Sequence, residues 1–140
     1  MTKPNVMNAI TVTKQRFGIF LTATLLAIGS WLGFAGAADA ATQTVKMGSD
    51  SFSLEYVPSK IEIQPGDTVK FVNNKIPPHN VIFDSGDMPA PELADQLSHT
   101  GLLYAPGDSF EVTFPEDAPT GKYGFYCQPH RGAGMVGYSI

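Results

Sequence analysis

The chain has 140 residues and a formal net charge of −4, a size that suits one small globular domain. Its acidic balance argues against nucleic acid or anionic lipid as a partner, because both of these carry negative charge. Its single cysteine, Cys127, excludes an internal disulfide bond.

The first 40 residues have the order of a secretory signal peptide. A start with basic but no acidic residues is followed by an almost wholly apolar stretch at 17–34 and a small-x-small sequence at 38–40. Such a segment is removed after export, so we predict a cleaved signal peptide at residues 1–40 and one mature domain at residues 41–140. A membrane anchor is the alternative, because the apolar stretch is nearly long enough to span a bilayer.

The predicted mature domain is strongly acidic for its size. Three of the nine basic residues and one of the thirteen acidic residues lie in the predicted signal, which leaves six and twelve and a net charge near −6. Export implies an oxidising compartment, in which an unpaired thiol needs an explanation. Coordination by a metal ion is one way to protect Cys127 from oxidation.

From residue 42 onward, short stretches alternate between apolar and polar residues and are separated by turn residues. Pro-Gly-Asp occurs at 65–67 and 106–108, where Pro fixes φ and Gly supplies a positive φ. The stretch at 84–103 is irregular, apart from one or two helical turns predicted at 91–97. The alternation predicts eight strands, at residues 42–47, 52–57, 60–64, 68–72, 79–83, 109–114, 122–127 and 135–140. Short strands with little helix indicate an all-β fold, either an antiparallel sandwich or a barrel.

Three residues that can bind metal lie close together near the end of the chain: Cys127, His130 and Met135. His79 follows a Pro-Pro pair at the start of a predicted strand, whereas we expect His99, in a polar stretch, to be a surface residue. Two imidazoles, one thiolate and one thioether are the ligand types of a trigonal copper site with a long axial bond. The alternatives are a buried apolar Cys with a gap-filling Met, or a structural zinc site on Cys and His, although Met is a poor zinc ligand.

The sequence around these residues resembles the plastocyanins of the cyanobacterial kind, within the cupredoxin family. The resemblance rests on CQPHRGAGM at 127–135, PPHNV at 77–81 and VKMGSD at 45–50, and it covers the whole predicted mature domain. The C-x2-H-x4-M spacing alone is shared with pseudoazurins. The resemblance implies an eight-stranded antiparallel Greek-key β-sandwich with one short helical turn. It also implies one copper ion, changing between Cu(I) and Cu(II), with the ligands His79, Cys127, His130 and Met135.

The resemblance also implies roles for residues around these ligands. Asn80 would brace the thiolate and the two loops by hydrogen bonds. Tyr126 alternates in direction with Cys127 along its strand, so it would point outward and mark a second electron route. Arg131 would orient a partner. Small and apolar residues would form a flat docking patch, made of Leu54, Pro77, Pro78, Leu103, Gly132, Ala133 and Gly134.

The resemblance implies a soluble, monomeric carrier of single electrons from cytochrome f to photosystem I in the thylakoid lumen. Such a carrier touches membrane complexes only at their periphery, and a respiratory terminal oxidase is a further candidate acceptor. We expect no enzymatic activity, since no Ser-His-Asp or paired-carboxylate motif stands out. The alternatives are a periplasmic cupredoxin of the pseudoazurin type, or a copper store or chaperone, which would need more Met or Cys residues in this loop.

Overall fold

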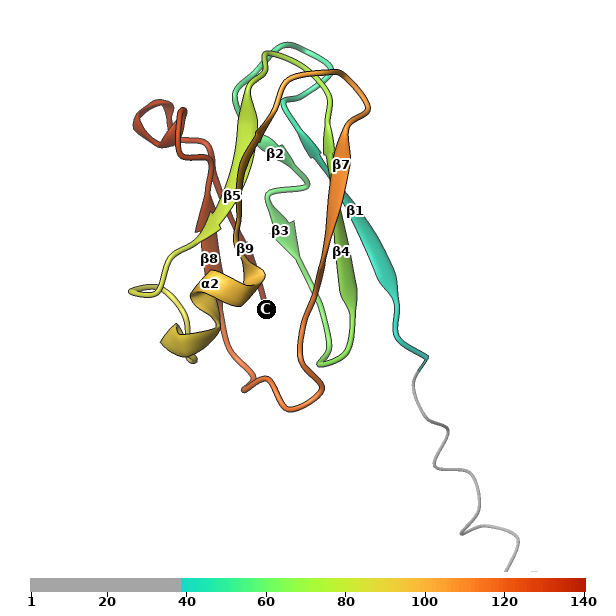
Figure 1. The fold of residues 1–140 in the computed structure, drawn as a ribbon, viewed down its shortest axis with the longest axis vertical. Helices are drawn as coiled ribbons and strands as arrows, with labels where there is room; N and C mark the ends of the chain where they lie inside the picture. The colour runs from blue at the N-terminus through green and yellow to red at the C-terminus, as the bar shows by residue number, and fades with distance from the viewer. Residues whose placement is uncertain (1–38) are drawn as a thin grey trace, which may run out of the picture. The chain divides into compact units, whose positions relative to one another are not determined.

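The computed structural model describes residues 39–140, so the predicted signal peptide lies almost entirely outside the described residues. Within the described part of the chain, no helix is both long and apolar enough to cross a membrane. The described residues form two β-sheets that face each other, with one short helix beside them (Figure 1).

The two sheets have the strand orders β2-β1-β4-β7 and β3-β9-β8-β5-β6. Neighbouring strands are antiparallel, except that β1 with β4 and β3 with β9 are parallel pairs. The strands are β1 (Thr42–Met47), β2 (Tyr56–Val57), β3 (Lys60–Ile61), β4 (Thr68–Asn73), β5 (His79–Phe83), β6 (His99–Leu103), β7 (Ser109–Thr113), β8 (Tyr123–Tyr126) and β9 (Val136–Ser139). The helical segments are two 3-10 turns, η2 (Pro91–Leu93) and η3 (Arg131–Ala133), and the α-helix α2 (Ala94–Leu97).

The predicted all-β sandwich is confirmed, and so are the helical turns at 91–97. The prediction of an irregular stretch that reaches residue 103 is wrong at its end, because His99–Leu103 forms β6 at the edge of a sheet. No side chain of β6 is fully buried, so this strand lacks the alternation that reveals a strand in a sequence. With β6, residues 39–140 contain nine strands where eight were predicted, and β2 and β3 are only two residues long.

The core lies between the sheets and is built by alternating side chains. Val45 and Met47 in β1, and Val69 and Phe71 in β4, are fully buried, while the residues between them face away from the core. The ring of Phe71 meets the ring of Phe125 from β8 edge-on, with the ring centroids 5.4 Å apart. Burying each large apolar side chain contributes about 1.5–3 kcal/mol to the free energy of unfolding. This core fixes the relative position of β4 and β8.

The same alternation carries β8 into the candidate site. Phe125 is buried in the core, so Cys127, two residues on, points to the same side and Tyr126 points to the other. The strands β5 and β8 are antiparallel neighbours, so the start of β5 lies at the same end of the sandwich as the end of β8. His79 therefore enters the site from β5, and Cys127 enters it from the end of β8.

Candidate metal centre

Three side chains converge at this end of the sandwich. The ligand atoms of His79, Cys127 and His130 all lie within 4.8 Å of one another. The Sγ of Cys127 is 3.6 Å from Nδ1 of His79 and 3.5 Å from Nδ1 of His130, and the two Nδ1 atoms are 3.2 Å apart. His79 and Cys127 are fully buried, whereas His130 is half-buried. His79 and Cys127 are 48 positions apart in the sequence, so the fold brings an imidazole nitrogen and a sulfur from distant segments together.

The orientation of the His79 ring is fixed by a backbone hydrogen bond. Its Nε2 lies 2.6 Å from the carbonyl oxygen of Lys75. A carbonyl can only accept, so Nε2 carries the ring proton and Nδ1 keeps a free lone pair that faces Cys127. Burial lowers the pKa of His79 below its ordinary value, although the hydrogen bond to Lys75 acts in the opposite direction. The ring is therefore neutral at pH 7, as a metal ligand must be.

The thiol of Cys127 lies in surroundings that suit a metal better than a free thiolate. Burial raises the pKa of this thiol, while the backbone N–H groups of Asn80 and His130 act to lower it. A cation bound next to the sulfur would reverse the effect of burial, because a coordinating thiol is deprotonated by its metal. The site is thus built for a thiolate that forms when a metal is bound.

The loop from Cys127 to Met135 is closed by its own backbone. The N–H of His130 donates to the carbonyl of Cys127 at 3.2 Å, and the N–H of Met135 donates to the carbonyl of His130 at 3.2 Å. The N–H of Cys127 donates in turn to the carbonyl of Met135 at 3.1 Å. Gly134 reverses the chain after η3 with a φ of +86°, a value that strains a residue with a side chain. Met135 is fully buried directly after this reversal and belongs to the core cluster.

The donors of this site fit copper. Thiolate and thioether sulfur favour Cu(I), and imidazole suits both oxidation states. Among the described residues, no carboxylate joins the cluster of His79, Cys127 and His130, so the site lacks the oxygen ligands that Ca²⁺ and Mg²⁺ require. Met135 is fully buried and its backbone is hydrogen-bonded to Cys127 and His130, but its thioether would be of little use to zinc, which takes nitrogen, thiolate and carboxylate ligands.

Comparison with known proteins gives the same answer. Residues 43–139 match the family model described as copper binding proteins of the plastocyanin/azurin family. The chain belongs to the plastocyanin/azurin family. It is 47% identical to the plastocyanin of Nostoc punctiforme over 94% of this chain and 96% of the relative. It is also 47% identical to the chloroplastic plastocyanin of Chlamydomonas reinhardtii, over 71% of this chain and 67% of the relative.

A solved plastocyanin has the same fold. The oxidised form of plastocyanin from Dryopteris crassirhizoma matches with a TM-score of 0.59 and 27% identity, covering 69% of this chain and 97% of that one. The predicted fold class and the predicted copper cofactor are both confirmed by this family membership. As a plastocyanin/azurin family member, the chain is a copper protein of electron transport.

Asn80 connects β5 to both neighbouring segments. Its Oδ1 accepts a hydrogen bond from the N–H of Gln128 at 2.8 Å, and its Nδ2 donates to the carbonyl of Thr100 at 3.1 Å and to Oε1 of Gln128 at 3.3 Å. Its backbone carbonyl accepts a hydrogen bond of 2.7 Å from the hydroxyl of Tyr56, whose pKa is raised by burial. Because Gln128 directly follows Cys127, Asn80 ties the metal loop to the strand that carries His79.

The residues predicted to form the docking patch differ in exposure. Pro77 and residues 132–134 are exposed, whereas Leu54, Pro78 and Leu103 are half-buried. Leu54 and Leu103 also pack against the core, and Leu103 lies opposite His79 in the β5–β6 pairing. The exposed part of this set therefore lies on the metal loop and the Pro-Pro loop.

Two exposed apolar residues at this end of the fold were missed by the sequence reasoning. Phe52 is 65% exposed with a φ of +62°, and Ile76 is 36% exposed with a φ of +55°. The ammonium of Lys75 lies 5.1 Å from the centroid of the Phe52 ring, so the loops that carry these residues are adjacent. The alternating pattern placed Phe52 on the same face as the buried Tyr56, and nothing in the sequence separates an exposed aromatic residue from a buried one here.

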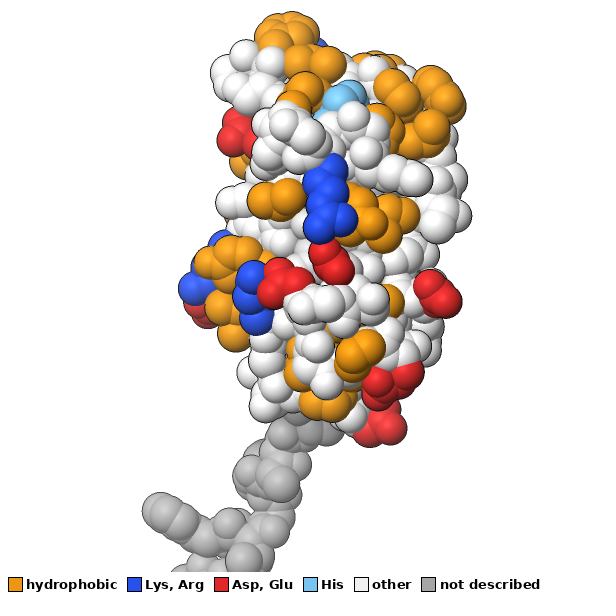
Figure 2. Space-filling view, turned by 90° about the vertical axis from the view of Figure 1, so that its left-hand side faces the viewer, with side chains coloured by type: hydrophobic (Ala, Val, Ile, Leu, Met, Phe, Trp, Pro, Cys, Tyr) orange, Lys and Arg blue, Asp and Glu red, His pale blue; other side chains and the backbone are white. Residues whose placement is uncertain are grey.

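Arg131 makes two contacts within the molecule. Its guanidinium carbon lies 3.9 Å from the centroid of the Tyr126 ring, and its Nη2 donates to Oδ2 of Asp84 at 2.8 Å. Figure 2 shows a face of the molecule on which basic side chains lie against hydrophobic ones with acidic side chains beside them. His99 lies outside the metal cluster, as expected, but it is half-buried in β6 and its ring stacks on Phe110 with centroids 4.1 Å apart.

Proposed function

We propose that this chain is a mobile carrier that takes single electrons from cytochrome f and delivers them to photosystem I in the thylakoid lumen. The observation that carries the proposal is the convergence of His79, Cys127 and His130 within 4.8 Å at one end of a plastocyanin-like sandwich. The names of the relatives in Nostoc punctiforme and Chlamydomonas reinhardtii support it. A respiratory terminal oxidase is the proposed second acceptor.

The proposed copper ligands are His79, Cys127, His130 and Met135. Bound copper supplies a one-electron couple between Cu(I) and Cu(II). The protein excludes water from the site by burying His79, Cys127 and Met135 completely. His130 is the one half-buried ligand, so its ring edge is the proposed point where an electron enters or leaves.

The proposed partner surface surrounds His130. Exposed Gly132, Ala133 and Gly134 have no bulky side chain, so a partner can approach the metal loop closely. A small, weakly charged contact suits a brief encounter, in which the association rate matters more than the affinity. Arg131, held over Tyr126, is the proposed charged contact at the rim of this surface. We propose that the carrier is a monomer without enzymatic activity.

We further propose that residues 1–40 are a signal peptide that is removed on export, leaving residues 41–140 as the lumenal carrier. The basic, apolar and small-residue order of this segment supports the proposal. Mass spectrometry of the protein purified from its native membrane fraction tests it, since a mature chain that begins at Ala41 is expected. A mature chain that retains the segment at 17–34 contradicts cleavage and favours an anchor.

Two measurements test the carrier function. The oxidised copper-loaded protein should be intensely blue from thiolate-to-copper charge transfer, and Cys127→Ser should abolish the colour while leaving a folded protein. Stopped-flow reduction by cytochrome f and flash-induced oxidation by photosystem I should then both be fast. A Cu(II) protein that is colourless would refute the copper-carrier function. A blue protein that reacts with neither partner would refute only the assigned partners.

A further inference from the structure

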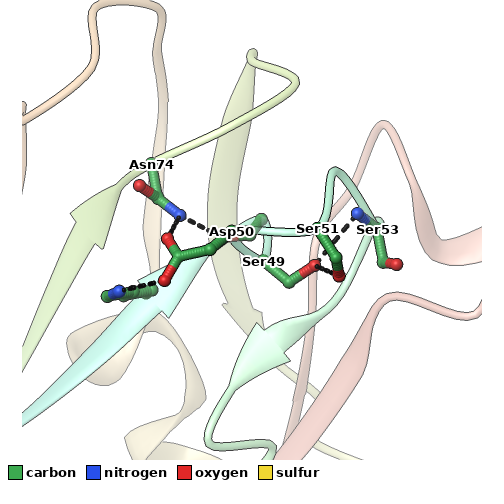
Figure 3. Close-up of polar contacts among 7 residues, drawn as sticks. Ser49, Asp50, Ser51, Ser53 and Asn74 are labelled. Atoms are coloured by element: carbon green, nitrogen blue, oxygen red, sulfur yellow. Dashed lines mark hydrogen bonds and ion pairs between the residues drawn. The ribbon is translucent and has the colours of Figure 1, made fainter.

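The loop that carries Lys75 is bound to the turn that follows β1. The Nδ2 of Asn74 donates to the carbonyl of Gly48 at 2.9 Å and to Oδ1 of Asp50 at 2.9 Å (Figure 3). The backbone N–H groups of Asn74 and Lys75 both donate to the carbonyl of Met47, at 3.0 and 3.3 Å. The start of the 74–78 loop is thus fixed to the end of β1 by four hydrogen bonds from two residues.

Gly48 allows an unusually close approach between these two segments. It has a φ of +83°, and a Cβ placed on it would overlap the carbonyl oxygen of Lys75 and lie 2.9 Å from its carbonyl carbon. That carbonyl oxygen is the one that accepts the hydrogen bond from Nε2 of His79. The backbone of Gly48 therefore lies directly against the atom that fixes the tautomer and orientation of the His79 ring.

The turn after β1 is itself held in shape by local hydrogen bonds. Asp50 pairs through Oδ2 with the ammonium of Lys46 at 2.8 Å, and this bond together with the one from Asn74 lowers the pKa of Asp50. Ser49 Oγ lies 2.9 Å from Ser51 Oγ and accepts a hydrogen bond of 3.0 Å from the N–H of Ser53 (Figure 3). The carboxylate of Asp50 is therefore ionised at pH 7 and well placed to orient the amide of Asn74.

We propose that Asn74 and Gly48 are positioning residues for the copper site: together they hold the Lys75 carbonyl against Nε2 of His79 and so direct Nδ1 toward Cys127. This inference rests on the proposed role of His79 as a copper ligand. The hydrogen bonds of Asn74 go to Met47, Gly48 and Asp50 and not to the metal cluster, and both residues act through one carbonyl oxygen. Asn74 supplies the hydrogen bonds that keep the loop in place, and Gly48 supplies the space that the carbonyl needs.

The test compares Asn74→Ala with Thr68→Val, a control that removes one side-chain hydrogen bond, to Thr113 Oγ1, at the other end of β4. Proton exchange at Nε2 of His79 is measured by ¹H–¹⁵N NMR in the Cu(I) and metal-free forms, and copper hyperfine splitting by EPR in the Cu(II) form. In Asn74→Ala we expect roughly fivefold to 25-fold faster exchange under native conditions, because two side-chain hydrogen bonds are lost and each is typically worth a factor of about five. We also expect a changed hyperfine splitting, whereas Thr68→Val should alter neither readout.

If Asn74→Ala changes neither the exchange rate nor the hyperfine splitting, or no more than Thr68→Val does, the positioning role is wrong. If Asn74→Ala does not fold, Asp50→Ala takes its place, because it removes the acceptor of one of the two side-chain bonds and adds no charge beside Asn74. Failure of the carrier function is seen separately, as a wild-type protein that is colourless with Cu(II). The exchange measurement on the metal-free form does not depend on that outcome.

Discussion

Replacing Asn80 with Ala should destabilise the metal loop. The side chain of Asn80 is fully buried and makes three hydrogen bonds, two to Gln128 and one to Thr100. At about 1 kcal/mol for each bond, their loss would cost about 3 kcal/mol. Gln128 and Thr100 are exposed, so water can replace part of what is lost, and we expect a decrease of about 2–3 kcal/mol in the free energy of unfolding.

Urea unfolding of the metal-free protein measures this decrease, and Gln128→Ala is the matched control. The control removes only the 3.3 Å side-chain bond and leaves the backbone of Gln128 bound to Asn80, so it should cost less than about 1 kcal/mol. In the copper-loaded protein, Asn80→Ala should also shift the visible absorption band, because Asn80 holds the residue next to Cys127. A cost for Asn80→Ala that is no larger than the cost of the control would refute the bracing role.

Three further predictions follow from the same geometry. Phe71→Ala should cost about 3–5 kcal/mol in urea unfolding, because this ring is fully buried among other aromatic rings; a cost under about 1 kcal/mol contradicts the described core. In the metal-free protein, burial lowers the pKa of His79 below 6.5, so below pH 6.5 the unfolded state binds more protons than the folded state. Burial raises the pKa of Cys127 above 9.0, so above pH 9.0 the unfolded state binds fewer protons than the folded state. The free energy of unfolding should therefore fall as pH drops below 6.5 and as it rises above 9.0. His79→Gln should make the fall below pH 6.5 less steep. An equally steep fall in that variant would contradict a buried neutral ring. Arg131→Gln should change the free energy of unfolding by less than about 1 kcal/mol, because its ion pair is solvent-exposed, yet it should slow stopped-flow reduction by cytochrome f. The control is Asp84→Asn, which leaves the positive charge in place. If the two variants are reduced at equal rates, the charge of Arg131 has no role in partner binding.

The fold could be predicted where a strand has one buried and one exposed face. The strands β1 and β4 show this alternation clearly, since Val45, Met47, Val69 and Phe71 are buried and their neighbours are not. The edge strand β6 has no buried side chain, so its pairing with β5 depends on backbone groups that every residue possesses. For this reason a sequence pattern could not reveal it.

The approach of Cys127 and His130 could be predicted because they are rare residue types at a compact spacing, whereas the prediction of His79 rests on the resemblance of its Pro-Pro loop to that of plastocyanins. What holds them in place could not be predicted in the same way. The acceptor for His79 is the backbone carbonyl of Lys75, which any residue at that position would supply. The ion pair between Arg131 and Asp84 joins residues 47 positions apart, and several other carboxylates in the sequence were equally plausible partners. Both contacts depend on how distant segments lie in the fold.

The three side chains that converge at this site depend on three separate supports in the fold. The direction of Cys127 follows from the alternation of β8, and thus from the packing of Phe125 in the core. The direction of His79 follows from the Lys75 carbonyl, and thus from the contact between the 74–78 loop and the turn after β1. His130 is placed by the backbone hydrogen bonds of its own loop. A substitution in the loop contact should therefore affect the copper spectra through His79 alone, with a smaller effect on stability than a core substitution such as Phe71→Ala.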